Sequence, residues 1–182
     1  MIVEKKQGVS DATAPGGAGV HKGRSAARLA AVQALYQIEL GGMKADSVIA
    51  EFVAHRLDRS IDGERASASD RAHFVAVVEG AARRADDLDR LVGEVLAEGW
   101  TLKRLGALLR ALMRAAAFEL LELEAVPFRV VIDEYVALAA SYFSDREPAF
   151  VNGALDKLAR RLRPAEFDAG ATGDDDGPGR AA

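Results

Sequence analysis

The sequence predicts an all-α fold, a compact bundle of six to seven helices, and three observations support this class. The chain of 182 residues is 49% hydrophobic but only 6% aromatic, so alanine, leucine and valine build most of its core. Alanine and leucine are strong helix formers. Apolar residues recur at helical spacing, without the alternation typical of strands. We expect one helical domain at 23–165, between a flexible basic extension (1–22) and a disordered acidic tail (166–182).

Several features are missing from the sequence, and their absence limits the classes of function that we expect. Without cysteine there is no disulfide framework, thiolate metal site or cysteine nucleophile. No apolar run of about 18 residues and no signal-peptide pattern occurs, so we expect a cytoplasmic protein that does not enter a membrane. No phosphate loop, nucleophile elbow or metal-ligand spacing is present, which predicts neither an enzyme nor a cofactor. The net charge of −4 still permits a local basic site.

The first predicted helix covers about residues 24–40 and ends at a glycine pair. Arg24 and Arg28 are four residues apart and share a face at its start, close to Lys22. Cations at this end oppose the helix dipole, which costs a few tenths of a kcal/mol each. That conflict predicts a compensating anion such as a phosphate. Two solvated arginines are the alternative.

The middle of the chain predicts four further helices. Residues 45–57 carry an apolar stripe, and Ser69 or Asp70 caps a long helix of about 26 residues. A joint at 99–101 contains Trp100, which we interpret as covering the core. The next helix, at about 105–123, is apolar on most faces and therefore central. Another follows at 128–143.

The last predicted helix covers about residues 148–163. Pro148 suits the first helical position, and Asp145 before it is the expected cap. Gly153 lies inside this helix, where glycine costs roughly 1 kcal/mol relative to alanine. We therefore expect either close packing or an approaching partner at Gly153.

This helix also carries the pattern most suggestive of RNA. Phe150, Lys157 and Arg161 follow at spacings of seven and four on one flank, and Asn152 begins the neighbouring polar row. Unpaired bases stack on aromatic rings while phosphates meet cations, so this row suits single-stranded RNA. Alternatively, Phe150 belongs to the core and the cations complement the carboxyl end of the helix.

Three motifs in order resemble the NusB transcription antitermination family. They are AVQALYQIEL (31–40), RAAAFEL (114–120) followed by Val126 and Pro127, and FVNGALDKLA (150–159). The resemblance spans roughly residues 24–163. It departs from the family's pattern at Leu109, where an acidic residue is common.

The resemblance implies an all-α, non-catalytic protein that binds boxA-type RNA together with the ribosomal protein NusE. Such a protein would act on the transcription elongation complex and support ribosomal RNA transcription. By position, the resemblance implies RNA contacts for Arg24, Arg28 and Phe150, with Lys157 as a helper. It also implies a partner surface at Tyr36, Asp145, Arg146 and Glu147. A homodimeric helical scaffold without RNA binding is the alternative function.

Overall fold

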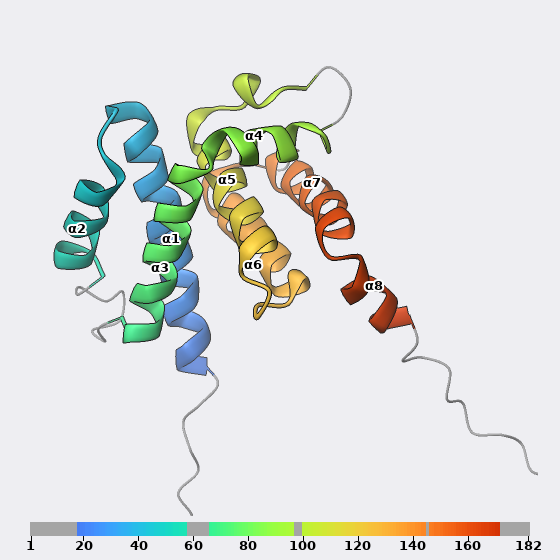
Figure 1. Ribbon diagram of the computed structural model, residues 1–182, viewed down its shortest axis with the longest axis horizontal. Helices are drawn as coiled ribbons and strands as arrows, with labels where there is room; N and C mark the ends of the chain where they lie inside the picture. Colours follow the sequence, from blue (N-terminus) through green and yellow to red (C-terminus); the bar gives the residue numbers. More distant parts are fainter. Residues whose placement is uncertain (1–17, 58–65, 97–99, 145, 172–182) are drawn as a thin grey trace, which may run out of the picture.

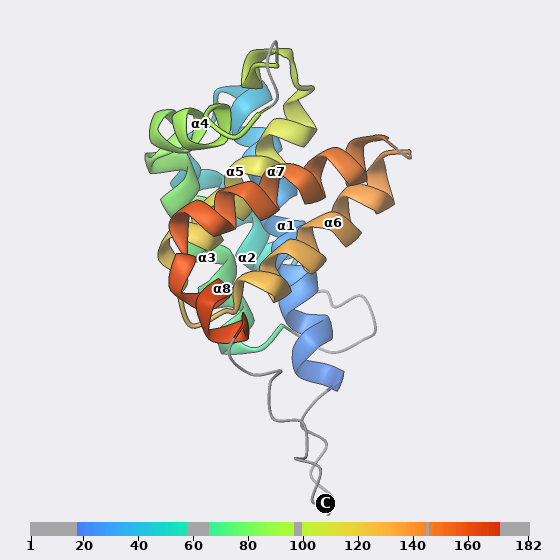
Figure 2. The ribbon, with the colours of Figure 1, turned by 90° about the vertical axis from the view of Figure 1, so that its right-hand side faces the viewer.

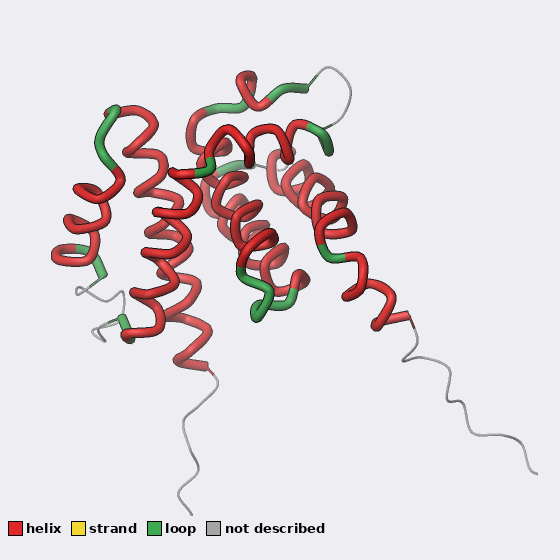
Figure 3. The backbone as a smooth tube through the Cα atoms, in the orientation of Figure 1, coloured by secondary structure: helices red, strands yellow, loops and turns green. Residues whose placement is uncertain are grey.

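The computed structural model describes residues 18–57, 66–96, 100–144 and 146–171, and helices dominate this part of the chain (Figure 1). No strand occurs within these ranges, as the tube in Figure 3 shows. The all-α prediction is confirmed. In chain order the elements are α1 (Ala18–Gly41), α2 (Ala45–His55), α3 (Ala68–Arg83), α4 (Ala85–Gly93), the 3₁₀ helix η1 (Leu102–Arg104), α5 (Ala107–Glu122), α6 (Phe128–Tyr142), α7 (Arg146–Leu162) and α8 (Pro164–Ala171).

Helix α5 is the centre of the bundle, as its nearly continuous apolar sequence predicts. Its residues from 111 to 120 are buried, with the exception of Arg114. Helices α1, α3, α4, α6 and α7 all pack against it. Helix α2 covers α1 and α3 on one side, while α6 and α7 pair on the other, and α4 crosses the top in Figure 1. This layout leaves outward-facing surface on α1, α6 and α7.

The long helix predicted after residue 69 is two helices, α3 and α4, which meet at Arg84. The backbone of Arg84 departs from helical geometry, with φ −110° and ψ 23°. Apolar spacing continues across the break, and the turn brings Leu88 and Val92 of α4 into the core beside α5. The start also differs from the prediction, because Ser67 is the cap. Its side chain accepts a bond from the Asp70 backbone N–H (3.1 Å), and Asp70 accepts one from the Ser67 N–H (3.3 Å).

The carboxyl-terminal part extends beyond residue 165, where the sequence placed the end of the domain. Helix α8 packs on α6 through Phe167, whose ring stacks on Phe128 at 4.0 Å between centroids. Arg163, buried between α7 and α8, donates hydrogen bonds to the carbonyls of Glu119 and Leu120, at 2.7 and 2.6 Å. These carbonyls belong to the last turn of α5, where the Glu119 carbonyl also accepts a hydrogen bond from the Leu123 N–H at 3.1 Å.

Two glycines in helices have opposite surroundings. A Cβ on Gly80 of α3 would come within 2.1 Å of the Phe118 ring, so α3 and α5 touch there only because Gly80 has no side chain. A Cβ on Gly153 of α7 would meet nothing within 4 Å. Close packing therefore does not explain Gly153. Of the two predicted reasons for this glycine, the approach of a partner is the one that remains.

Candidate nucleic-acid interface

The basic start of α1 faces α3 rather than lying open. The Arg24 guanidinium donates to Ser69 Oγ at 2.8 Å, lies 3.2 Å from His73 Nδ1 and pairs with Asp70 at 3.4 Å. Its side chain is about a quarter exposed, and Lys22, two residues earlier, is exposed. The first turns of α1 thus present a basic edge whose Arg24 is already oriented by α3.

Arg28 is buried, at 2% exposure, which differs from the solvent-facing cation that its spacing suggested. Its Nε lies 3.0 and 3.2 Å from the two carboxylate oxygens of Glu119, and its Nη2 lies 3.0 Å from Oε2. Glu134 of α6 supplies a second carboxylate at 3.4 Å. The anion predicted to compensate these arginines is therefore supplied from within the protein. A phosphate contact by Arg28 would require it to leave Glu119.

Glu119 is the centre of a buried polar group of four side chains, Arg28, His73, Glu119 and Tyr135, which we term the Glu119 cluster. Its carboxylate is fully buried and also contacts His73 Nε2 at 2.9 Å and the Tyr135 hydroxyl at 2.8 Å. The cluster ties α1, α3 and α6 to α5. It holds the basic start of α1 against the rest of the fold.

The cluster shifts the pKa values of its members. Burial alone would raise the pKa of Glu119, but hydrogen bonds from His73 and Arg28, together with their charges, outweigh burial and lower that pKa. Burial, followed by the charge of Glu119, raises the pKa of Tyr135 well above its usual value. Burial alone would lower the pKa of Arg28, but its bonds to Glu119 raise it. Arg28 and Glu119 therefore form a charged pair at neutral pH.

The lowered pKa of Glu119 predicts a loss of stability in acid. A carboxyl whose pKa is depressed by folding stabilises the protein above its unfolded pKa of about 4.3. That stabilisation disappears as the pH falls through the folded pKa. We expect the free energy of unfolding, measured with urea at pH 7, 5, 4 and 3, to fall more steeply below pH 5 in the natural protein than in Glu119→Gln. Equal slopes would contradict this role of Glu119.

Phe150 lies in the first turns of α7 and is half-buried. It packs against the core, so the core alternative holds in part, while stacking on RNA stays a prediction. Its ring also meets Trp100, with centroids 5.5 Å apart and planes tilted by 35°. Trp100 is 52% exposed, so it does not close the core as the sequence suggested. Together the two rings form a partly open aromatic surface.

The polar residues predicted beside Phe150 differ in their surroundings. Asn152 and Lys157 are exposed. Arg161 is exposed too, but its guanidinium is paired at 2.5 Å with Glu94, the residue that follows α4. On the neighbouring row, Arg160 is paired with Asp156 at 2.9 Å. Lys157 is therefore the cation of this flank best placed to meet a phosphate.

The structure does not bring the two predicted RNA elements into one spot. The first turns of α1 lie at the lower end of the bundle in Figure 2, while α7 begins toward the upper right, beyond α6. An RNA strand that contacts both would have to cross the surface between them. A short RNA could occupy the α7 element alone.

The predicted partner residues lie near the other end of α1 and at the α6–α7 connection. Tyr36 is 37% exposed, with exposed Leu40 one turn further along the same face. Arg146 is exposed and Glu147 is half-buried, whereas Asp145 lies outside the described residues. Gln33 donates to the hydroxyl of exposed Tyr142 at 3.1 Å, linking α1 to the end of α6. Leu109, the departure from the family's pattern, is buried and adds nothing to this surface.

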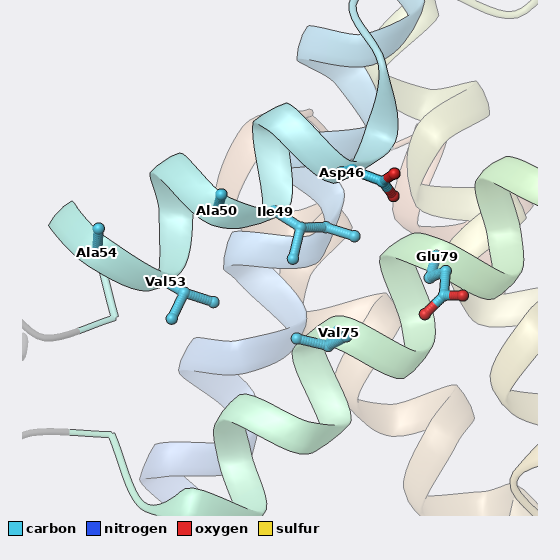
Figure 4. A pocket seen from close by; sticks show the side chains of 7 residues that line it. All are labelled: Asp46, Ile49, Ala50, Val53, Ala54, Val75 and Glu79. Atoms are coloured by element: carbon cyan, nitrogen blue, oxygen red, sulfur yellow. The ribbon is translucent and has the colours of Figure 1, made fainter.

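Other parts of the described surface fit RNA less well. A shallow hollow of about 580 Å³ between α2 and α3 is lined by apolar side chains and by the carboxylates of Asp46 and Glu79 (Figure 4). Its charge would repel phosphate. Within the described ranges, no group of three His, Asp or Glu side chains could hold a metal ion. None of the described helices has the length and apolar character to cross a membrane.

Sequence reasoning missed the Glu119 cluster and the aromatic pair. A lone carboxylate in an otherwise apolar stretch of α5 was the available signal for the cluster, because a buried charge requires partners. For the aromatic pair, the one signal was that Trp100 is the single tryptophan of the chain.

The described part of the chain is an all-helical bundle with exposed aromatic and basic side chains on outer helix faces. The chain belongs to the NusB family, whose model matches residues 25–160. The transcription antitermination protein NusB of Caulobacter vibrioides is 49% identical over 140 residues, which cover 77% of this chain and 94% of that protein. That of Rhodopseudomonas palustris is 42% identical over 169 residues, covering 93% and 100%.

Solved structures agree on the fold. T. maritima NusB superposes with a TM-score of 0.67 at 26% identity, covering 80% of this chain and 96% of that chain. A crystal structure of the antitermination factors NusB and NusE with double-stranded RNA matches with a TM-score of 0.64 at 24% identity, covering 76% and 97%. At that identity the second likeness establishes the fold alone.

Proposed function

We propose that this protein is a transcription antitermination adaptor that binds boxA-type single-stranded RNA together with NusE and supports ribosomal RNA transcription. The observation that carries the proposal is the family match over residues 25–160, which includes most of the first helix and Phe150. The relatives of this chain are antitermination proteins by name. A structure of the same fold holds NusE and RNA. The role is non-catalytic and belongs to the cytoplasm, as part of the elongation complex.

We assign direct RNA contacts to exposed or partly exposed side chains. Phe150 offers a ring for stacking, Asn152 an amide, and Lys157 a charge for phosphate. Lys22 and Arg24 form the second basic element at the start of α1. Arg28 and Arg161 are engaged by carboxylates, so we assign them to positioning rather than contact.

We assign NusE binding to the exposed surface of Tyr36 and the α6–α7 connection with Arg146 and Glu147. Apolar and aromatic exposure on α1 suits a protein partner more than an RNA backbone. A bound NusE would add its own RNA contacts, and two linked sites bind one strand more tightly than either alone.

A titration of labelled boxA-type RNA tests the proposal. The protein is added alone and with NusE, at two salt concentrations, with a scrambled RNA and a duplex of the same sequence as controls. We expect binding that NusE tightens, that salt weakens and that scrambling abolishes. Absence of binding by folded protein under every condition would refute the proposal and leave the homodimeric scaffold, which sedimentation would reveal.

Phe150→Ala should weaken RNA binding by about 1–3 kcal/mol, roughly fivefold to more than a hundredfold in Kd, because one stacked base is lost. Phe167→Ala is the matched control, since Phe167 is also a half-buried phenylalanine but stacks on Phe128 of α6. Circular dichroism checks that both variants fold. Unchanged RNA affinity in folded Phe150→Ala would assign Phe150 to the core instead.

A further inference from the structure

Trp100 is a large aromatic side chain, and about half of its surface is exposed to solvent. It stands before η1, in the segment that leads into α5, and reaches Phe150 of α7 (5.5 Å between ring centroids). We propose that Trp100 is a second base-stacking residue, which extends the RNA surface from Phe150 so that the pair holds two neighbouring unpaired bases. This role rests on the proposed RNA-binding function and assigns a residue that the sequence pattern placed in the core.

The exposure of Trp100 decides against a purely structural role. An indole that served only to cover Phe150 would bury most of its own surface, yet 52% of it remains exposed. Exposed tryptophan is uncommon outside binding surfaces, where its wide flat ring gives much contact area with few rotatable bonds. The contact with Phe150 is tilted, and Phe150 itself is only half-buried, so both residues keep exposed surface.

The backbone after Trp100 is fixed without help from the indole. Arg104 N–H donates to the Thr101 carbonyl at 2.9 Å, and Arg110 of α5 donates to the carbonyls of Leu102 and Leu105, both at 2.9 Å. Leu102 and Leu105 are themselves buried. Trp100 is therefore held on an anchored segment, and a rigid platform loses little entropy when a base stacks on it.

The charges around the pair favour RNA over a protein partner. Lys103 and Arg104 of η1 are exposed and follow Trp100 by three and four residues. Lys157 follows Phe150 by two turns on the same flank of α7. The opposing charges on α7 are Glu147, three residues before Phe150, and Asp156, which is paired with Arg160. Glu94, which follows α4, is paired with Arg161. Aromatic rings among cations are the usual combination for single-stranded nucleic acid.

The fluorescence of the protein reports on this residue directly, because Trp100 is the single tryptophan of the chain. Unlabelled boxA-type RNA is titrated into the full-length protein, and tryptophan emission and its quenching by acrylamide are followed. We expect RNA to change the emission and to shield the indole from acrylamide. The RNA concentration at half of the emission change should equal the midpoint of a titration followed by the anisotropy of labelled RNA.

Variants supply the second readout. Trp100→Ala should weaken RNA binding about fivefold or more, and Trp100→Phe should restore most of the loss, because a smaller ring still stacks. Val130→Ala is the matched control, since Val130 is an exposed apolar residue on α6. The fluorescence titration uses the natural protein, so it still tests the inference if Trp100→Ala fails to fold.

The outcomes separate this inference from the proposed function. If labelled RNA binds while Trp100 emission and accessibility stay constant and Trp100→Ala binds normally, the inference is overturned and the proposed function stands. A second outcome is that NusE alone shields Trp100 from acrylamide, a signal that is read after subtracting the emission of NusE mixed with Trp100→Phe. If NusE does so and added RNA causes no further change in emission or quenching, the residue belongs to a protein interface and the inference is again overturned. If the natural protein binds no RNA even with NusE, the proposed function itself fails.

Discussion

Replacing Glu119 by alanine is expected to lower the free energy of unfolding by about 3–5 kcal/mol, the largest effect of any change considered for this protein. The carboxylate is fully buried and receives bonds from Arg28, His73 and Tyr135. Its removal leaves the Arg28 cation buried with Glu134 as its remaining carboxylate, at 3.4 Å. A buried charge without adequate partners is far more costly than the pair itself is stabilising.

Urea unfolding followed by circular dichroism measures this effect. The matched control is Glu122→Ala, because Glu122 lies three residues further along α5 but is exposed and pairs with Arg84 at the surface. An exposed ion pair contributes about 0–1 kcal/mol, so the control should remain near the natural stability. Similar losses in the two variants would mean that the Glu119 cluster is not the buried polar junction described.

The cluster also changes what Arg28→Ala would report. An exposed arginine would give a purely electrostatic loss of RNA affinity with a smaller salt dependence. A buried arginine bound to Glu119 instead gives an unfolding effect, with any RNA effect following from displacement of α1. Both the stability and the salt slope of RNA binding therefore need to be measured on one Arg28→Ala sample.

The positions of α2, α5, α6 and α7 could be predicted because each carries its own apolar periodicity, whereas α1 begins six residues before its predicted start and α8 was not predicted. Helices α5 and α6 lie within two residues of their predicted limits. The turn at Arg84 could not be predicted, because the apolar spacing and charge alternation continue across it. What bends the chain there is the packing of Leu88 and Val92, which depends on where α5 lies.

The candidate site shows the same limit. Spacing correctly placed Arg24 and Arg28 on one face of a helix, but not at its start, because α1 begins at Ala18 and both arginines lie inside it. Their ion pairs are with Asp70, Glu119 and Glu134, which are 46 or more residues away in the chain. Periodicity within one helix carries no information about such distant partners. The contact between Trp100 and Phe150 is equally long-range, and it became visible only in three dimensions.

Replacing Gly80 by alanine is expected to lower the free energy of unfolding by about 3 kcal/mol, although alanine is the better helix former. The new Cβ would lie 2.1 Å from both Cε2 and Cζ of Phe118, much closer than carbon atoms can approach. Gly80 and Phe118 are both buried, and α3 packs against α5 along this line. The ring cannot move without disturbing its neighbours, because protein interiors are close-packed.

Gly153→Ala is the matched control, since it makes the same change inside α7 with no atom within 4 Å of the new Cβ. It should raise the free energy of unfolding by about 0.5–1 kcal/mol, because alanine loses less backbone entropy than glycine on helix formation. Urea unfolding of the two variants therefore separates two effects: helix propensity should raise the free energy of unfolding in Gly153→Ala, and steric overlap with Phe118 should lower it in Gly80→Ala.

Combining Gly80→Ala with Phe118→Leu should recover part of the loss in stability, because the smaller side chain vacates the position of the ring carbons. A Gly80→Ala variant as stable as Gly153→Ala would mean that α3 and α5 lie further apart than in this structure.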